Sequence, residues 1–515
     1  MNLMSLLASA AGAFGQRTAF CNGQDSITYA ELLQAAGTAA TQLQKSDSAH
    51  LAMLDVSSFA LPIGLFASAW AGRPFVPINY RLSDGEINAL LERIAPASLI
   101  TDDEWARQLA THPAVECISR DSFIAQARTQ SPAHEADWDM DPEATAVLLF
   151  TSGTTGAPKA AVLRQRHLVS YMHSAVEFGS AAEEEVLLVA VPPYHIAGIV
   201  SVISAVYAGR KVVQLPNFNA RRWIELAQQE RVTTAFLVPT MLRAIVAELE
   251  LLGRPELPHL RALAYGGGKM PGPVIEAAMA LLPEVEFTQA YGLTETSSTL
   301  CVLLPRHHRA AMESTEPAQR RRMTSVGLPL PGVEIQIRDD SGKVLAPGQR
   351  GEIYVRGEQV SGEYVGKGSM LDADGWFATR DAGELDEEGY LFLAGRADDV
   401  IVRGAENMSP GEIEDVLLTH AAVADVAVIG VPDEQWGEAV AAVVVLHDAD
   451  AIDVHLQQSL KQELTDLVKA TLRSSKVPQH IRFEQSLPYN ETGKLLRRVV
   501  REGFVLDTDI GVGQE

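Results

Sequence analysis

The segment with the clearest chemical signal is Thr151-Ser-Gly-Thr-Thr-Gly-Ala-Pro-Lys159. Its first six positions hold four hydroxyl residues and two glycines, which suit neither a strand nor a helix interior. They suit a tight loop whose backbone N–H groups and hydroxyls converge on phosphate oxygens, because Gly153 and Gly156 permit positive φ and close approach. The spacing differs from the Gly-x4-Gly-Lys-Ser/Thr loop of kinases and GTPases. The segment therefore predicts a phosphate-binding loop of another kind.

Further segments that combine glycines, aromatic rings and ionisable side chains follow this loop along the chain. They are Pro192–Gly198, Tyr265–Gly268, Gln289–Glu295, Gly375–Asp381, Gly395–Asp399 and Pro488–Lys494. Taken in this order with Thr151–Lys159, they resemble the signature motifs of the adenylate-forming superfamily. That superfamily includes acyl- and aryl-CoA synthetases, peptide-synthetase adenylation domains and beetle luciferases. The resemblance covers residues 1–505.

The resemblance implies an ATP site built from several of these motifs. The residues that it assigns to ATP or AMP are Thr151, Ser152, Gly153, Thr154, Thr155, Gly156, Lys159, Gly266, Gly267, Tyr291, Gly292, Asp381 and Arg396. The hydroxyls of the loop would hold the β- and γ-phosphates, and Tyr291 would stack on adenine. Asp381 would accept both ribose hydroxyls, and Arg396 would reach the ribose or the phosphates.

The same resemblance implies the chemistry of activation. A carboxylate attacks the α-phosphate of ATP and pyrophosphate leaves. Because both partners are anions, the site must supply positive charge and fixed donors. Glu295 would ligate Mg²⁺, and Thr294 would contact the α-phosphate. Lys494 would bridge the carboxylate and the α-phosphate, and His195 completes the expected catalytic set.

The C-terminal motifs imply a second half-reaction in the same site. A C-terminal domain would rotate about Asp398 and bring up a loop at which the thiol of CoA attacks the acyl-adenylate. The residues of this CoA-binding loop would be Gly404, Ala405, Glu406 and Asn407. Arg403–Glu414 is similar to the matching pattern of acyl-CoA synthetases. Loading of a carrier protein is the alternative, and nucleotide binding without catalysis is a third possibility.

The acyl pocket that the resemblance implies is mostly small and apolar. Its residues are His195, Ile196, Ala197, Val238, Tyr265, Gly266 and Ala290. Pro192–Gly198 contains no carboxylate that could pair with the ammonium group of an amino acid, so an amino-acid substrate is disfavoured. The pocket residues include no arginine that could pair with a second carboxylate, so a diacid is disfavoured too. Fatty, aryl and alicyclic acids all stay open. Arg380, Ala405 and Lys269 depart from the family pattern, and we expect Lys269 to face solvent.

Hydrophobic periodicity predicts the elements that position these motifs. Buried strands are indicated by short apolar runs at Ala146–Phe150, Val186–Ala190, Thr234–Val238 and Ala262–Ala264. Helical patterns separate them, which predicts α/β architecture with largely parallel sheets. Alternation of apolar and polar residues in Val333–Arg338 and Glu352–Arg356 predicts a half-exposed antiparallel region.

The predicted fold is therefore α/β and multidomain. We expect a large N-terminal adenylation domain at 1–396 with two α/β subdomains and a small β-barrel-like subdomain, then a hinge at 397–400. A small mobile α+β domain at 401–505 would carry Lys494, and 506–515 would be a tail. Within the domain at 401–505 we expect helices at 412–419 and 453–472 and strands at 423–431 and 439–446. Surface loops are predicted at Ser131–Pro142 and Arg306–Met323.

Composition narrows the class of protein. The 515 residues carry a formal charge of −24 and are 47% apolar, the balance of an ordinary globular protein. So acidic a surface disfavours nucleic acid and anionic membranes as partners. The apolar run Ser57–Gly72 is too short to span a membrane. Three separated cysteines favour a reducing compartment, so we expect a cytoplasmic protein, and family membership alone suggests a homodimer.

The N-terminus predicts a packed helix in place of a secretion signal. Leu3, Leu6, Leu7 and Ala10 recur at helical spacing, and the basic segment that opens a signal peptide is missing.

Overall fold

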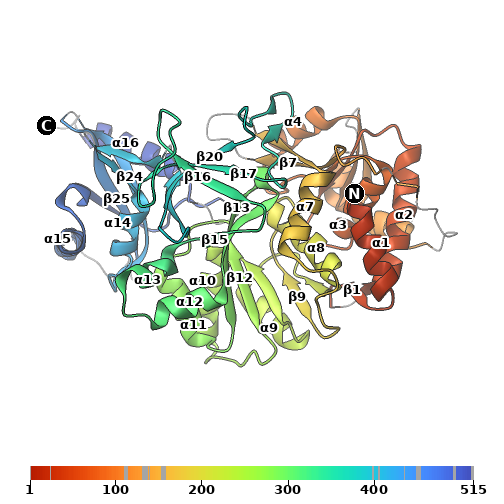
Figure 1. The fold of residues 1–515 in the computed structure, drawn as a ribbon, viewed down its shortest axis with the longest axis horizontal. Helices are drawn as coiled ribbons and strands as arrows, with labels where there is room; N and C mark the ends of the chain where they lie inside the picture. The colour runs from red at the N-terminus through yellow and green to blue at the C-terminus, as the bar shows by residue number, and fades with distance from the viewer. Residues whose placement is uncertain are drawn as a thin grey trace.

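Two α/β subdomains make up most of the chain, and a smaller domain follows them (Figure 1). The computed structural model describes residues 2–23, 25–109, 114–129, 137–138, 140–151, 158–396, 399–403, 406–433, 435–447, 454–490 and 495–511.

The larger sheet has nine strands, and we call it the nine-stranded sheet. In spatial order these are β15 (Leu328–Pro329), β14 (Ser298–Leu303), β13 (Glu286–Leu293), β12 (Ala262–Gly266), β11 (Thr234–Leu237), β9 (Val186–Val189), β10 (Lys211–Gln214), β1 (Thr18–Cys21) and β2 (Ser26–Thr28). The strands from β13 to β1 run parallel, whereas β14 and β15 at one end and β2 at the other pair with their neighbours in antiparallel fashion. The largely parallel sheet predicted from buried apolar runs is confirmed.

The second sheet has eight strands, and we call it the eight-stranded sheet. Its spatial order is β19 (Gly368–Ser369), β18 (Glu363–Tyr364), β8 (Lys159–Arg164), β7 (Thr145–Thr151), β4 (Phe75–Pro77), β3 (His50–Leu54), β5 (Ala97–Thr101) and β6 (Val115–Ser119). The strands from β7 to β6 are parallel, and β7, β8, β18 and β19 pair in antiparallel fashion. The hairpin of β7 and β8 carries the predicted phosphate loop at its tip.

A layer of helices packs between the two sheets and forms the main core. Its members are α1 (Leu3–Phe14), α2 (Tyr29–Lys45), α3 (Ala60–Ala71), α6 (Arg120–Ala127), α7 (Gln165–Ala175) and α8 (Ile196–Ala208). The core combines Val212 of the nine-stranded sheet with Leu149 of the eight-stranded sheet. Eleven of the twelve residues of α3 are buried, which explains its continuous apolar run. The predicted N-terminal helix is confirmed, because Leu3, Leu6, Leu7 and Ala10 are buried in α1.

Other helices cover the outer faces of the two sheets (Figure 1). The nine-stranded sheet is covered by α9 (Ala220–Gln229), α10 (Pro239–Leu251) and α11 (Gly272–Leu281), and the eight-stranded sheet by α4 (Asp84–Ile94) and α5 (Asp103–Leu109). Trp223 and Ile245 anchor the first group in the core. Both faces of each parallel sheet are thereby removed from water.

The antiparallel region predicted around Val333–Arg338 and Glu352–Arg356 is confirmed as a four-stranded sheet. It comprises β16 (Glu334–Arg338), β17 (Gly351–Arg356), β20 (Phe377–Leu385) and β21 (Leu391–Arg396), and all neighbours are antiparallel. It stands where the sequence predicts a small β-barrel-like subdomain, but its strands form an open sheet, since no pairing among the described residues closes β16 onto β21.

The C-terminal domain has a sheet of five strands covered by helices. They are β23 (Glu406–Met408), β22 (Ile401–Arg403), β25 (Gly437–Leu446), β24 (Val423–Asp433) and β26 (His480–Glu484), with α14 (Pro410–Leu417), α15 (Val454–Thr471), α16 (Arg497–Gly511) and the 3₁₀ turn η5 (Ser474–Lys476). The helices and strands expected in this domain are confirmed. The blue end of the chain in Figure 1 shows them as a separate body beside the nine-stranded sheet.

One predicted loop is wrong. Residues 306–323 form α12 (Pro305–Glu313), α13 (Pro317–Arg321) and most of the turn η2 (Arg322–Thr324). Prolines occupy the first helical turn of α12 and α13, where a missing N–H costs nothing, and His308 and Ala311 bury one side of α12. The many exposed charges of this segment hid the short buried face. Most of the other predicted loop, Ser131–Pro142, lies outside the described residues.

Among the described residues, no helix has the length and apolar character needed to cross a bilayer.

Candidate functional site

The tip of the β7–β8 hairpin positions the predicted phosphate loop. Thr151 and Lys159 face each other across the hairpin, and the Thr151 hydroxyl donates to the Lys159 carbonyl at 3.4 Å. Residues 152–157, and with them Ser152, Gly153, Thr154, Thr155 and Gly156, lie outside the described residues. The structure therefore shows where the loop begins and ends.

Two strands of the four-stranded sheet hold the predicted ribose residues together. Asp381 and Arg396 are register partners on β20 and β21, and the Arg396 guanidinium lies 2.9 Å from Asp381 Oδ1. Arg396 also donates to the Thr379 carbonyl at 3.1 Å. This second contact fixes the arginine side chain beside the carboxylate, and the pair is mostly shielded from water.

Tyr291 connects this pair to the nine-stranded sheet. Its hydroxyl donates to Asp381 Oδ2 at 2.7 Å. Burial, together with the Asp381 carboxylate, raises the pKa of Tyr291 well above its usual value, so the hydroxyl stays protonated and remains a donor. Each carboxylate oxygen of Asp381 thus has one partner and keeps a further lone pair. Asp381 can therefore still accept two ribose hydroxyls.

Glu295 lies in the 3₁₀ turn η1 (Thr294–Thr296), directly after β13. Its side chain meets Tyr364 of β18, whose hydroxyl donates to Glu295 Oε1. The Tyr364 ring also faces the Lys159 ammonium, with 5.6 Å between Nζ and the ring centroid. Lys159 and Glu295 are 136 residues apart in the sequence. In the structure both contact Tyr364, Glu295 at its hydroxyl and Lys159 at its ring face.

The sequence reasoning missed Tyr364. It lies in a strand of two residues, which is too short to produce a periodic pattern. Its role depends on contacts with two distant segments, so only the tertiary structure reveals it.

The donor set around Glu295 fits a magnesium ion. Mg²⁺ prefers hard oxygen ligands and is usually held by one or two carboxylates plus substrate phosphates and water. Within the described part of the chain, Tyr364 is the hydrogen-bond partner of Oε1, and no partner is found for Oε2 of Glu295. One carboxylate oxygen is thus available as a ligand.

Glycines allow close backbone approach behind the site. A Cβ on Gly292 would lie 1.6 Å from the Ser298 carbonyl oxygen, where β13 and β14 shift register. A Cβ on Gly266 would lie 2.3 Å from the carbonyl oxygen of Ala290. No side chain fits at either position, which explains glycine in both predicted nucleotide-side turns.

Part of the predicted acyl pocket surrounds the start of α8. His195 is the N-cap residue of α8, and Ile196 and Ala197 form its first turn. The Tyr194 and His195 rings pack at 4.5 Å between centroids. Burial, with a smaller effect of Arg81, lowers the pKa of His195 to about 4, so its imidazole is neutral near pH 7. Its buried Nε2 has no hydrogen-bond partner among the described residues.

The remaining acyl-pocket residues lie just after β11, at the end of β12 and within β13. Val238 precedes α10 and would be 3.5 Å from a Cβ at Gly267, and Gly266 pairs with Ala290. Tyr265 is 1% exposed, and its ring packs in the core behind the sheet. Its hydroxyl lies 2.8 Å from Nε2 of His308. Whether Tyr265 touches a substrate therefore stays a prediction.

Several predicted residues cannot be placed. Asp398, Gly404, Ala405 and Lys494 lie outside the described residues, and only the backbone of Glu406 and Asn407 is described, in β23. The predicted hinge, CoA loop and catalytic lysine therefore remain predictions.

Two departures from the family pattern have structural explanations. The Arg380 side chain is 71% exposed and lies 4.0 Å from Glu352, and its backbone adopts φ 62°. The prediction that Lys269 faces solvent is confirmed, since its side chain is 48% exposed, but the lysine also makes contacts that the sequence did not predict. Its ammonium lies 2.8 Å from Asp415 Oδ1 and donates to the Gly411 carbonyl at 2.6 Å, both on α14 of the C-terminal domain. This contact joins residues that the sequence separates widely.

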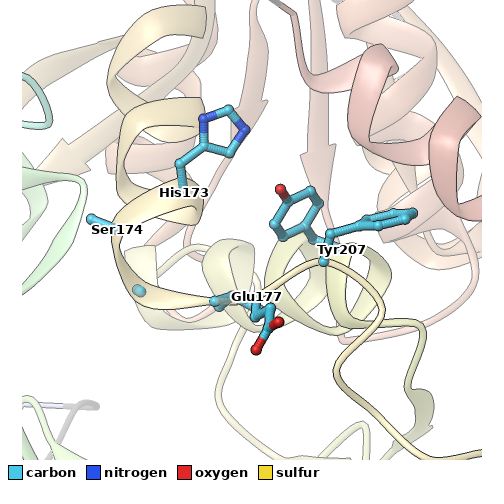
Figure 2. Close-up of a pocket in the computed structure, with 7 residues that line it drawn as sticks. His173, Ser174, Glu177 and Tyr207 are labelled. Carbon is cyan, nitrogen blue, oxygen red and sulfur yellow. The ribbon is translucent and has the colours of Figure 1, made fainter.

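A hollow of about 610 Å³ lies elsewhere on the molecule (Figure 2). His173 and Glu177 line it at the end of α7, and Tyr207 lines it near the end of α8. Because a helix rises 1.5 Å per residue, Tyr207 is about 17 Å along α8 from Ile196. None of its lining residues belongs to the predicted site.

Two family models match the chain: that of the AMP-binding enzymes over residues 7–365, and that of the AMP-binding enzyme C-terminal domain over residues 412–494. A fatty acid–[acyl-carrier-protein] ligase of Streptomyces coeruleorubidus is 34% identical over 451 residues, which cover 85% of this chain and 84% of the relative. A 2-succinylbenzoate–CoA ligase of Bacillus subtilis is 32% identical over 500 residues, which cover 95% of each chain.

A solved structure agrees with these matches. The o-succinylbenzoate CoA synthetase of Bacillus subtilis, in complex with its acyl-adenylate intermediate, superposes with a TM-score of 0.81 at 30% identity and covers 96% of this chain and 97% of its own. The resemblance inferred from seven ordered motifs is thus confirmed, and the protein belongs to the AMP-binding enzyme family, in the acyl- and aryl-CoA synthetase branch of the adenylate-forming superfamily.

Proposed function

We propose that this protein is an ATP-dependent, AMP-forming ligase that joins a hydrophobic carboxylic acid to CoA. One observation carries the proposal: Tyr291, Asp381 and Arg396 form a single hydrogen-bonded group where two sheets meet, with Glu295 following on the strand of Tyr291. A ring-stacking residue, a ribose acceptor, a cation and a free carboxylate oxygen are what an ATP–metal complex requires. The family supplies the reaction class.

In the first half-reaction the nucleotide would lie against Tyr291 and Asp381. A carboxylate oxygen of the acid attacks the α-phosphorus, and the bond from this phosphorus to the bridging oxygen of pyrophosphate breaks. Arg396, Lys159 and the loop hydroxyls at 151–155 would hold the phosphate oxygens in line. Bound at Glu295, Mg²⁺ would supply charge neutralisation of the phosphates. We assign Lys494 to the oxygens between which the new bond forms.

In the second half-reaction a thiol would attack the carbonyl carbon of the acyl-adenylate, and AMP would leave. A rotation of the C-terminal domain about Asp398 would withdraw Lys494 and present the loop at 404–407. One site would thereby serve two reactions in sequence.

The acid is proposed to be hydrophobic. His195, Ile196 and Ala197 would line the pocket with little charge, because the buried imidazole is neutral near pH 7. One similar curated protein is named for a fatty acid, which supports that class. The other is named for 2-succinylbenzoate, which supports an acid with an aromatic ring but itself carries two carboxylates. Alicyclic acids stay in the same group.

The acceptor has one serious alternative. The relative from Streptomyces coeruleorubidus is named as a ligase for an acyl-carrier protein, which favours testing a carrier protein beside CoA. The pattern Arg403–Glu414 and the 2-succinylbenzoate–CoA ligase support CoA.

A single experiment separates these possibilities. AMP release is measured over a panel of fatty, aryl and alicyclic acids with CoA, with a phosphopantetheinylated carrier protein, or with neither, and the thioester is identified by mass. We expect AMP release to require CoA. A rate indifferent to CoA, with acyl-adenylate accumulating, would exclude the CoA ligase, and a thioester on the carrier protein alone would establish the alternative.

The variant Lys494→Ala tests the catalytic assignment. Pyrophosphate exchange into ATP should disappear, while thioester formation from synthetic acyl-adenylate should survive. A chain that binds ATP but exchanges no pyrophosphate with any acid would instead be a nucleotide-binding protein without catalysis.

A further inference from the structure

The segment Ser361–Val365 connects two parts of the site that belong to different sheets. Its N–H groups at Ser361 and Gly362 donate to the Glu295 carbonyl at 2.8 and 3.1 Å. On the other side, Val365 N–H donates to the Ala160 carbonyl at 3.0 Å. The segment therefore holds the turn of Glu295 against the hairpin that carries the phosphate loop.

Tyr364 places its side chain inside this connection. The hydroxyl donates to Glu295 Oε1, and the ring faces the Lys159 ammonium at 5.6 Å. The Tyr364 side chain thus contacts an anion with its polar end and a cation with its π face.

This arrangement solves an electrostatic problem. A lysine and a glutamate that both approach a phosphate site would tend to pair with each other, which would neutralise the carboxylate and compete with a divalent cation. No ion pair forms between Lys159 and Glu295, both of which the structure describes. The Lys159 ammonium lies over the face of the Tyr364 ring instead. The Tyr364 hydroxyl donates to only one of the two carboxylate oxygens of Glu295.

We propose that Tyr364 is a positioning residue that orients the Glu295 carboxylate toward a divalent cation and keeps the Lys159 ammonium on its ring face, away from that carboxylate. The inference rests on the proposed function, since it assumes that Glu295 binds the cation of an ATP–metal complex. Tyr364 itself touches neither the acid nor the phosphates in this role. Its effect is on metal affinity, separate from nucleotide affinity.

The test uses the full chain and Mn²⁺ as a spectroscopic substitute for Mg²⁺. Free Mn²⁺ is counted by electron paramagnetic resonance at saturating non-hydrolysable ATP analogue, and affinity for the metal-free analogue is measured separately by calorimetry. Tyr364→Phe keeps the ring and removes the hydroxyl. We expect its Mn²⁺ dissociation constant to rise about tenfold, as for loss of a hydrogen bond to a charged group, with metal-free affinity within twofold of wild type.

Two further variants make the comparison specific. Tyr364→Leu removes the ring as well, and we expect it to weaken the metal-free analogue too, because Lys159 loses its position. Tyr354→Phe is the matched control: Tyr354 on β17 also donates to a glutamate, Glu352, but lies outside the site, so Mn²⁺ binding should not change.

A double-mutant cycle shows whether Tyr364 acts through Glu295. In the Glu295→Gln background, Tyr364→Phe should cause no additional loss of Mn²⁺ affinity. An equal loss in both backgrounds, or wild-type Mn²⁺ binding in the folded Tyr364→Phe chain, would overturn the proposal. A wild-type chain that binds Mn²⁺ and the analogue but forms no AMP would contradict the proposed function, while the comparison of metal affinities would still decide the role of Tyr364.

Discussion

At the scale of single residues, the site depends on the Asp381 carboxylate, which accepts hydrogen bonds from two protein side chains and can still accept more from a ligand. Its two oxygens accept hydrogen bonds from Arg396 and Tyr291, and each keeps a lone pair that could accept a ribose hydroxyl. A neutral amide has half the acceptor sites of a carboxylate and no charge to hold the arginine. Asp381 is thus both a ligand-binding and an organising group.

Asp381→Asn should therefore weaken ATP binding at least tenfold, which corresponds to about 1.4 kcal/mol, because the charge-assisted hydrogen bonds of the carboxylate are lost. Isothermal calorimetry with a non-hydrolysable analogue measures this change. Arg380→Ala is the control, because the neighbouring Arg380 side chain is 71% exposed and its ion-pair partner is Glu352, at 4.0 Å. Equal affinities for both variants would contradict the assignment of Asp381.

Buried histidines are a second feature at this scale. His308 Nδ1 lies 3.2 Å from the Leu304 carbonyl, which can only accept, so Nδ1 carries the proton and Nε2 accepts from the Tyr265 hydroxyl. Burial lowers the pKa of His308 to about 4, against 6.5 for an exposed histidine. A second proton on the imidazole would break the bond from Tyr265.

This predicts acid sensitivity of a definite sign. Between pH 6.5 and 4 the unfolded chain binds a proton at His308 that the native chain does not, so the free energy of unfolding falls as pH falls through this window. His308→Gln should reduce the loss of stability between pH 7 and pH 4.5 by about 1–2 kcal/mol, measured by urea unfolding. The exposed His480→Gln should leave that pH dependence nearly unchanged. Identical slopes for His308→Gln and wild type would refute the buried neutral histidine.

At the scale of elements, the β13–β14 hairpin positions Tyr291 and Glu295 relative to each other. A register shift follows Tyr291, and Ser297 and Ser298 adopt φ of 55° and 100° in the turn. Such backbone angles cost energy in residues other than glycine, so the surrounding contacts must enforce them. Gly292 makes the tight pairing possible by presenting no Cβ.

Gly292→Ala should disrupt this hairpin, because the added Cβ would lie 1.6 Å from the Ser298 carbonyl oxygen. We expect loss of at least 3 kcal/mol of stability or an insoluble chain, since the backbone must move. Gly272→Ala is the matched control: nothing lies within 4 Å of its Cβ position at the start of α11, so stability should stay or rise by about 0.5–1 kcal/mol. Thermal unfolding compares the two, and a stable Gly292→Ala chain would refute the close approach.

At the scale of the whole molecule, three ion pairs among the described residues join the two domains, and in each of them the cation belongs to the N-terminal domain. Cations of the N-terminal domain face carboxylates of the C-terminal domain in Arg243–Asp425 at 3.2 Å, Lys269–Asp415 at 2.8 Å and Arg350–Glu412 at 3.6 Å. Exposed pairs contribute about 0–1 kcal/mol each and are screened by salt. Contacts of this strength are compatible with the domain rotation proposed for the second half-reaction.

Lys269→Met should therefore shift the distribution of domain orientations up to about fivefold, and the charge exchange Lys269→Glu with Asp415→Lys should restore it. Energy transfer between dyes at exposed Leu251 and Leu456 reports the orientation, and added salt should mimic the substitution. Lys45→Met, which removes an exposed charge far from the interface, serves as control. Unchanged transfer in Lys269→Met at low salt would contradict a role for this pair.

The sequence by itself determined the family, the enzyme class, the α/β architecture and most strands, because loops rich in glycine and hydroxyl residues and buried apolar runs are local signals. Its error at residues 306–323 has a local cause, because the charges of this segment outnumber the two buried side chains of α12 and the pattern predicts a loop. The contact of Lys269 with Asp415 has no local signal, since it joins separate domains.

Only the tertiary structure decided which polar groups meet. Tyr364 lies in a strand of two residues and carries no periodic signal, yet it bridges Glu295 and Lys159. Asp381, Arg396 and Tyr291 come from two sheets and form one group. A motif specifies which side chains a reaction needs, whereas their distances depend on how separate sheets pack, and that packing is determined by contacts spread over the whole chain.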